Sequence, residues 1–152
     1  MISKQHERLS YVVLLIIWLV MNLYGCHSKV DKPQPTAIAF LNKMYIKQDL
    51  KEAYEHTGGQ LKKRLDSTPN LRTVQMYVMG IHMEKVEKIR YMGADMDFFQ
   101  LKSENVKIVY QLVGIKNGIK FKDHITMRMD YDYEESKWKV TQIIPDKFNM
   151  NR

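Results

Sequence analysis

The spacing of hydrophobic residues changes once along this chain, close to Glu84. Between residues 36 and 83, hydrophobic residues recur at intervals of three and four, which is the spacing of amphipathic helices. Between residues 84 and 144, hydrophobic and polar residues alternate, which is typical of strands with one buried face. Helices followed by a run of strands predict an α+β domain, with N-terminal helices packed on one face of a curved antiparallel sheet.

Three helical segments are expected in the first half. The longest begins after Pro35 with Thr36 as its N-cap, and it breaks near Asp49 before a new turn. A short basic helix follows two glycines, and a Ser-Thr-Pro-Asn loop with capping residues precedes the last helix. The expected helical ranges are 36–54, 60–65 and 71–83.

Four strands are expected in the second half. The dipeptide Asn117-Gly118 separates the second from the third and is a strong signal for a two-residue hairpin turn. A polar turn at residues 134–137 precedes the fourth strand, which Pro145 ends. The expected strand ranges are 84–93, 106–115, 119–133 and 138–144.

The third strand has one apolar face and one polar face. The polar face holds Lys122, His124, Thr126, Arg128, Asp130 and Asp132. Asp123 is the single polar residue on the other face, which is rich in aromatic residues and methionine. Methionine adapts to ligands of varied shape, so this face is a candidate pocket or partner surface; packing under the helices is the alternative. The candidate residues are Phe121, Met127, Met129, Tyr131 and Tyr133.

The N-terminal segment has the order of a secretory signal. Lys4 and Arg8 precede an uncharged apolar stretch, Leu9–Leu23, which is shorter than the roughly 20 residues that a membrane-spanning helix needs. Leu23, Gly25 and Cys26 resemble the lipobox of bacterial lipoproteins, although Tyr24 stands where a smaller residue is usual. An uncleaved N-terminal anchor is the alternative.

The lipobox resemblance implies cleavage between Gly25 and Cys26, with acyl chains such as palmitate on Cys26. More than one chain gives stable attachment to a membrane. Because His27 rather than Asp follows the cysteine, the resemblance also implies an outer-membrane protein that faces the periplasm. The expected organisation is a signal peptide at 1–25, a lipidated cysteine and extended tether at 26–35, and one domain at 36–148.

Composition sets further bounds. Removing residues 1–25 leaves 127 residues, which suits one domain, and a single cysteine allows no intramolecular disulfide. The net charge of +7 suits an anionic membrane surface, peptidoglycan or a nucleic acid, and a solvated basic surface is the alternative. No nucleic-acid-binding motif accompanies the charge, so no nucleic-acid partner is expected.

Three segments carry a resemblance to a fold family: residues 35–41 and 49–54 of the first helices, and residues 135–140, where a polar turn leads into Trp138-Lys139-Val140. They resemble the nuclear transport factor 2-like (NTF2-like) cone-shaped α+β fold. More narrowly, they resemble small bacterial lipoproteins with such a domain of unknown function (DUF4878-like). The resemblance implies a curved sheet with helices on one face and a homodimer formed through the sheet.

Enzymes of the cone fold place acidic, histidine or tyrosine side chains in an apolar pocket, where a carboxylate gains a raised pKa. The possible equivalents match no family motif residue by residue, and we predict no enzymatic activity. No spacing of His, Cys or carboxylates predicts a metal site, and no cofactor is expected. The residues considered for catalysis are Tyr45, Tyr54, Asp95, Asp97, His124 and Asp130.

Three functions follow as hypotheses. The first is a non-enzymatic periplasmic lipoprotein whose domain binds an envelope protein or a small hydrophobic ligand. The second is an assembly component of a secretion complex, similar to type IV secretion proteins of the VirB8 kind, if Leu9–Leu23 remains as an anchor. The third is a cone-fold isomerase or dehydratase, which requires a buried acid facing an enclosed pocket.

Overall fold

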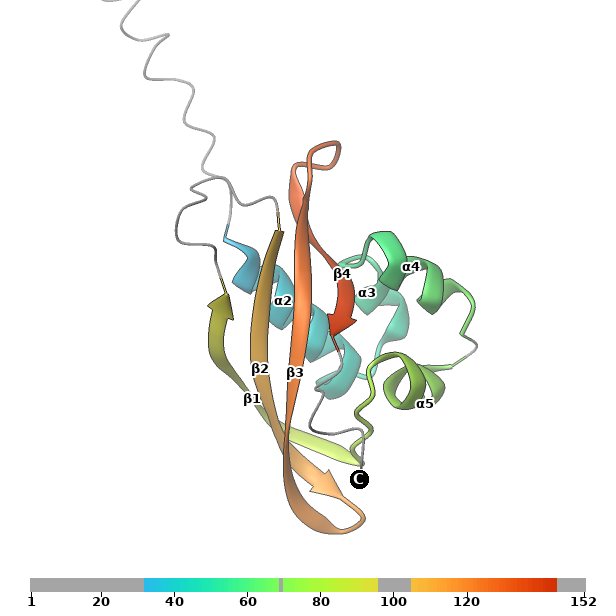
Figure 1. Ribbon diagram of the computed structural model, residues 1–152. Helices are drawn as coiled ribbons and strands as arrows, with labels where there is room; N and C mark the ends of the chain where they lie inside the picture. Colours follow the sequence, from blue (N-terminus) through green and yellow to red (C-terminus); the bar gives the residue numbers. More distant parts are fainter. Residues whose placement is uncertain (1–31, 69, 96–104, 145–152) are drawn as a thin grey trace, which may run out of the picture. The chain divides into compact units, whose positions relative to one another are not determined.

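A computed structural model describes residues 32–68, 70–95 and 105–144 (Figure 1). These residues form a layer of short helices against one four-stranded antiparallel sheet, which confirms the α+β prediction. The predicted signal peptide, the lipidation site Cys26 and the candidate Asp97 lie outside the described residues. No helix in the described ranges is long and apolar enough to cross a membrane.

The sheet is a simple meander in which each strand pairs with the next. The strands are β1 (Lys85–Asp95), β2 (Asn105–Lys116), β3 (Ile119–Asp132) and β4 (Lys137–Ile144), in the order β1-β2-β3-β4. Asn117 and Gly118 join β2 to β3 with φ angles of 53° and 74°. Positive φ at both central residues is the geometry of a type I′ turn, so the predicted hairpin is confirmed.

The helical layer consists of short pieces, two of which widen into π-helical turns. The break predicted near Asp49 is confirmed, because the Asp49 side chain caps a new helix by accepting from the Glu52 backbone N–H at 2.9 Å. Asn70 caps the last helix in the same way through Thr73. The pieces are α2 (Pro33–Leu41), η1 (Asn42–Ile46), α3 (Leu50–Tyr54), α4 (Gly59–Asp66), α5 (Leu71–Thr73) and η2 (Val74–Val78).

Two predicted helix boundaries are wrong. The first helix begins at Pro33 and not at Thr36, because proline fits the first turn, where no backbone N–H is needed. Residues 33–35, predicted to be part of an extended tether, belong to this helix, and Pro33 is itself buried. At the other end, the predicted helix 71–83 stops at Val78, and Gly80 follows with a φ of 71°.

The core lies between the helices and one face of the sheet, which we call the inner face. On α2 and η1, residues Ala37, Phe40, Leu41 and Met44 recur at helical spacing and are fully buried. In Figure 1, α2 runs behind β2 and β3. Burying one such large apolar side chain stabilises the fold by about 1.5–3 kcal/mol. The inner face contributes Val106, Ile108, Tyr110, Leu112, Ile125, Met127, Met129 and Val140.

Local backbone features curve the sheet and cover one of its edges. β1 departs from regular register at two places, and a Cβ at Gly114 would overlap the carbonyl oxygen of Lys85, so only glycine fits there. At the β4 edge, the Val140 backbone N–H donates to the His56 carbonyl at 2.9 Å, and Gly58 N–H donates back to Val140 at 3.0 Å. The segment before α4 thus shields β4 from further pairing.

Candidate functional site

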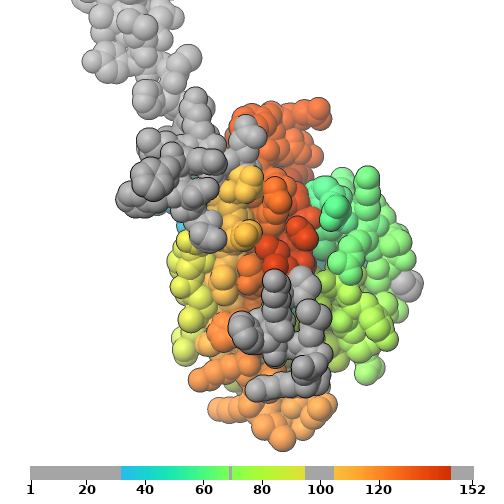
Figure 2. All heavy atoms as spheres, in the orientation of Figure 1, coloured from blue at the N-terminus to red at the C-terminus, as the bar shows by residue number. Residues whose placement is uncertain are grey.

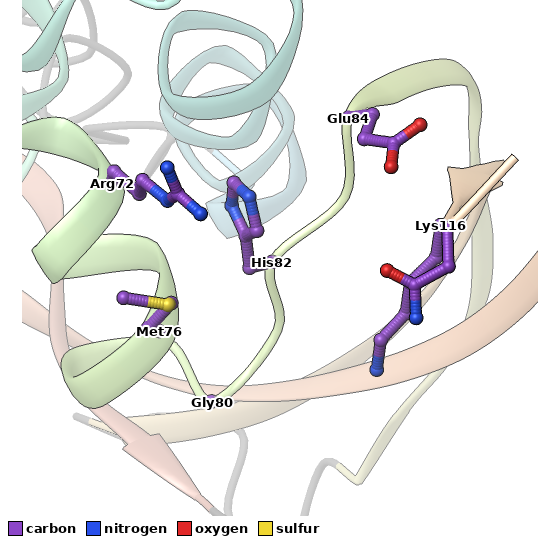
Figure 3. A pocket seen from close by; sticks show the side chains of 7 residues that line it. Arg72, Met76, Gly80, His82, Glu84 and Lys116 are labelled. Carbon is purple, nitrogen blue, oxygen red and sulfur yellow. The ribbon is translucent and has the colours of Figure 1, made fainter.

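A cleft of about 520 Å³ opens between η2, the loop that leads into β1, and the β2–β3 hairpin (Figure 3). Figure 3 shows Arg72 and His82 on one wall, with Glu84 and Lys116 on the other. Most of these side chains are polar, and the walls come from parts of the chain that are distant in sequence. The lining residues are Arg72, Met76, Gly80, His82, Glu84, Lys116 and Asn117.

His82 is held in the cleft by a buried amide. Gln75, which is only 4% exposed, donates from Nε2 to the Met44 carbonyl at 2.9 Å. That bond fixes the direction of the amide, and the Oε1 of Gln75 lies 3.0 Å from Nδ1 of His82. Because an amide oxygen can only accept, Nδ1 of His82 is the donor in this contact, which fixes the orientation of the ring.

The cleft holds two permanent cations, Arg72 and Lys116, the titratable His82 and one carboxylate, Glu84. The Lys116 ammonium lies 4.9 Å from the centre of the Phe121 ring, a cation–π contact that steers its position. This arrangement suits a small polar ligand with negative charge, or an acidic segment of a partner, because two fixed cations face one carboxylate. Within the described ranges, no group of three or more His, Cys, Asp or Glu residues could hold a metal ion.

The sequence indicated a methionine- and aromatic-rich face of β3 as a pocket or partner surface. In the structure, the methionines of this face are buried and its aromatic residues are partly exposed. Met127 and Met129 are fully buried in the core, as the alternative of core packing predicts, so they offer nothing to a ligand. Phe121 and Tyr131 are half-buried, and Tyr133 is 67% exposed. The Tyr131 ring packs edge-on against Trp138, with 5.4 Å between ring centres, and against Tyr133. Of the five predicted residues, the three aromatic ones reach the surface and the two methionines do not.

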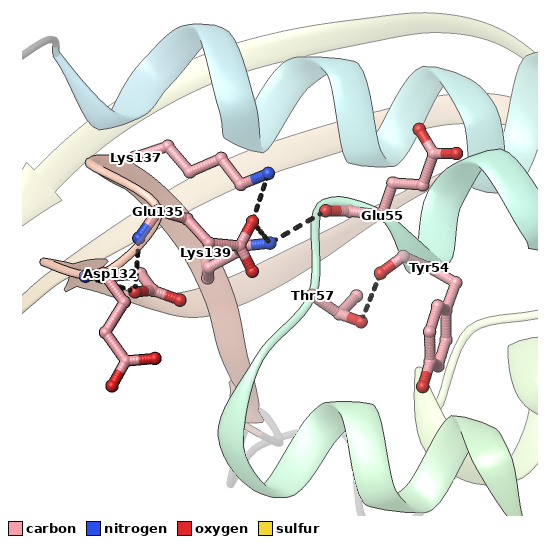
Figure 4. Close-up of polar contacts among 8 residues, drawn as sticks. Tyr54, Glu55, Thr57, Asp132, Glu135, Lys137 and Lys139 are labelled. Carbon is pink, nitrogen blue, oxygen red and sulfur yellow. Dashed lines mark hydrogen bonds and ion pairs between the residues drawn. The ribbon is translucent and has the colours of Figure 1, made fainter.

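A second polar cluster joins β4 to the turn after α3 (Figure 4). Lys139, only 6% exposed, donates from Nζ to Glu135 at 3.0 Å and to the Glu55 carbonyl at 3.2 Å. Lys137 forms an ion pair with the same Glu135 carboxylate. Hydrogen bonds from Lys137 and Lys139 lower the pKa of Glu135 to about 2. Because Lys137 and Lys139 both pair with Glu135, we interpret the cluster as a structural clamp.

The residues considered for catalysis are scattered. Tyr45 is buried and its hydroxyl donates to the Ile81 carbonyl at 2.8 Å, and burial raises its pKa above the usual value. The pKa of Tyr54 is raised by a hydrogen bond to Asp66. His124 and Asp130 lie on the opposite face of the sheet from Tyr45: His124 contacts Gln111 at 3.2 Å, and Asp130 accepts from Thr141 at 2.7 Å. Asp95 ends β1.

The alternation pattern marks Asp123 only as a polar exception on an apolar face, and the structure shows that it is buried near Tyr45. It lies on the inner face and is 7% exposed, and its charge contributes to the raised pKa of Tyr45. Its Oδ1 accepts from the backbone N–H of His124 at 2.9 Å. A carboxylate beside a buried tyrosine is therefore present in the interior, and neither of the two lines the cleft.

Comparison with protein-family models, with curated proteins and with solved structures finds no match to this chain in any of the three. The candidate site therefore depends on geometry alone. Sequence reasoning missed the cleft because Arg72 and Lys116 are far apart in the chain and neither belongs to a motif. The one local signal was the hairpin turn, since Asn117 lies in the cleft wall.

Proposed function

We propose that this protein is a lipid-anchored lipoprotein of the bacterial cell envelope whose α+β domain binds a partner or ligand and performs no catalysis. The observation that carries the proposal is the segment Leu23–Cys26 behind a basic start and an apolar stretch. On this proposal, cleavage follows Gly25, Cys26 carries the lipid, and the domain faces the periplasm from the outer membrane.

Several structural features support a binding domain of the NTF2-like kind. The helices cover one face of an antiparallel meander, which is the layout that the cone-shaped fold requires. Tyr45 and Asp130 already make hydrogen bonds that hold the fold together, and they lie on opposite faces of the sheet. This separation favours a binding role over an isomerase or dehydratase. The cleft is the proposed contact site, and its cations favour an anionic ligand or envelope protein over a hydrophobic ligand.

The mass of the intact protein, extracted from bacterial membranes, tests the anchor. A mass equal to residues 26–152 plus acyl chains supports the proposal, and Cys26→Ser should then abolish both acyl labelling and cleavage. A mass equal to the full unmodified chain would overturn it. That result would favour an uncleaved anchor at Leu9–Leu23, as in secretion components of the VirB8 kind, an alternative that the bulky Tyr24 of the lipobox keeps open.

A further inference from the structure

One end of the outer face of the sheet, the face turned away from the helices, is strongly cationic. The register places Lys85, Ile115 and Lys120 in one row across β1, β2 and β3, and Lys88, Val113 and Lys122 in the next. The third row holds Arg90, Gln111 and His124. We call Lys85, Lys88, Arg90, Lys120 and Lys122 the cationic end. Figure 2 shows β1, β2 and β3 (yellow to orange) side by side on this face.

The charges of the cationic end are not neutralised. All five side chains are exposed, and within the described ranges none of them makes an ion pair with a carboxylate. Glu87, at an irregularity of β1, is the one acidic residue of this part of β1. Strand spacings put the five charges within roughly 10 Å by 13 Å. That is close to the Debye length of about 8 Å at physiological salt, so the charges reinforce one another.

The other end of the same face is balanced. Arg128 pairs with Asp130 at 3.1 Å, and Lys107 lies opposite Arg128 in the register. Positive charge is therefore concentrated at one end of the face and not spread over it. An exposed, uncompensated patch of this kind attracts a surface of opposite charge.

We propose that the cationic end docks on the anionic phospholipid headgroups of the membrane that holds the lipid anchor. This inference rests on the proposed function, because it requires lipid at Cys26. The folded domain begins at Pro33, so six residues, 27–32, separate it from the anchor, and six residues span at most about 20 Å when extended. A tether of this length keeps the domain close to the headgroups, so docking needs only that the cationic end turn towards them.

The chemistry of the surface favours a bilayer over a nucleic acid. Between the flanking cations, β2 presents Val113 and Ile115, which offer aliphatic surface, and the three rows hold no Phe, Tyr or Trp ring on which a base could stack. Four of the five cations are lysines, whose long apolar stems can lie along such surface while the ammonium groups reach phosphates. Each cation near an anionic membrane surface strengthens binding by about fivefold.

The test uses the full processed chain, inserted through its lipid into preformed vesicles of phosphatidylcholine, alone or mixed with about one-third phosphatidylglycerol. An amine-acetylating reagent reports lysine exposure, read by mass spectrometry at Lys120 and Lys122. Lys51 and Lys63, exposed on α3 and α4, are internal controls. We expect acetylation of Lys120 and Lys122 to slow several-fold in anionic vesicles only, and to recover near 1 M salt, where the Debye length is about 3 Å.

A matched pair of variants sharpens the test. Lys120→Gln/Lys122→Gln should weaken docking by about 25-fold, read as faster acetylation of Lys88, whereas Lys51→Gln/Lys63→Gln removes the same charge without effect. Equal acetylation in both kinds of vesicle, with the protein still floating with them, would overturn the docking and leave the anchor intact. Failure to float with either kind would overturn the anchor and the docking together. Protection of Lys120 and Lys122 by an oligonucleotide, but not by anionic vesicles, would also overturn the docking and point to a nucleic-acid partner.

Discussion

Two pairs of lysines on the same sheet differ in their ion pairing and in their exposure to solvent. Lys137 and Lys139 on β4 share the Glu135 carboxylate, and Lys139 is almost fully buried. Lys120 and Lys122 on β3 are exposed and have no carboxylate partner among the described residues. The first group fastens the fold, and the second is available to other molecules. The net charge of the chain therefore says less about function than where each charge lies in the strand register.

The position of each group explains the difference. Lys139 lies beside the chain segment that covers the β4 edge, and a Cβ at Gly58 would come within 3.1 Å of the Lys139 Cβ. Its stem is enclosed there, and its ammonium reaches the Glu55 carbonyl. Lys122 pairs across the centre of the sheet with Val113, and the segment that covers β4 does not reach it.

The largest effect in the clamp region should come from the core residue between the two clamp lysines. Trp138 is 5% exposed and packs edge-on against Tyr131. Trp138→Ala should lower the free energy of unfolding by about 3–5 kcal/mol, because it leaves a large cavity. Urea unfolding followed by circular dichroism measures the loss. Tyr77→Ala, at a side chain 73% exposed, is the control and should change stability by less than about 0.5 kcal/mol. Equal stability of the two variants would show that β4 is not anchored through this ring.

The next effect tests whether Lys139 is structural. Lys139→Ala removes the donor to the Glu55 carbonyl and to Glu135, and it should lower the free energy of unfolding by about 1–3 kcal/mol. Lys122→Ala is the matched control, with an expected change below about 0.5 kcal/mol. If both variants lose the same stability in urea, the contrast between the two lysine groups does not hold.

A smaller effect should appear in acid. The pKa of Glu135 is about 2 in the folded protein and 4.5 for an ordinary glutamate, so its ion pairs stabilise the fold fully above pH 4.5. This stabilisation is lost as pH falls from 4.5 towards 2. Glu135→Gln should therefore flatten the decline of stability over that window, measured by thermal unfolding at a series of pH values. Glu134→Gln, at an exposed neighbour, should decline as the parent does; a flattening there as well would remove the assignment to Glu135.

Local patterns in the sequence predicted most of the fold. Asn117-Gly118 predicted its hairpin because only residues that tolerate positive φ fit both turn positions. Alternation predicted the buried face of β2, and Asp49 predicted the helix break because its side chain caps the next helix. The sequence pattern places the start of α2 three residues too late, because Pro33 fits an extended segment as well as the first turn of a helix.

The candidate site was beyond local patterns. The cleft forms where the β2–β3 hairpin lies near η2, and no spacing of residues in the sequence predicts that these two segments are close. Met127 and Met129 illustrate the same limit: their alternation predicts one shared face, but only the helices packed on that face decide that they are core residues and not a pocket wall. The cationic end likewise requires the register of β1 against β3, which joins Lys88 to Lys122 across β2.

The smallest effect is the one that decides whether the cationic end is free for docking. Lys120→Gln/Lys122→Gln should change the free energy of unfolding by less than about 0.5 kcal/mol, because both side chains are exposed and neither makes an ion pair within the described ranges. The stability should rise slightly at low salt, since like charges lie close together in the parent, and the gain should vanish as salt screens them. Urea unfolding at two salt concentrations measures both quantities. A loss above about 1 kcal/mol would mean that these lysines hold the sheet as Lys139 holds β4. The cationic end would then have a structural role, and weaker docking of this variant could not be attributed to lost contacts with phospholipid.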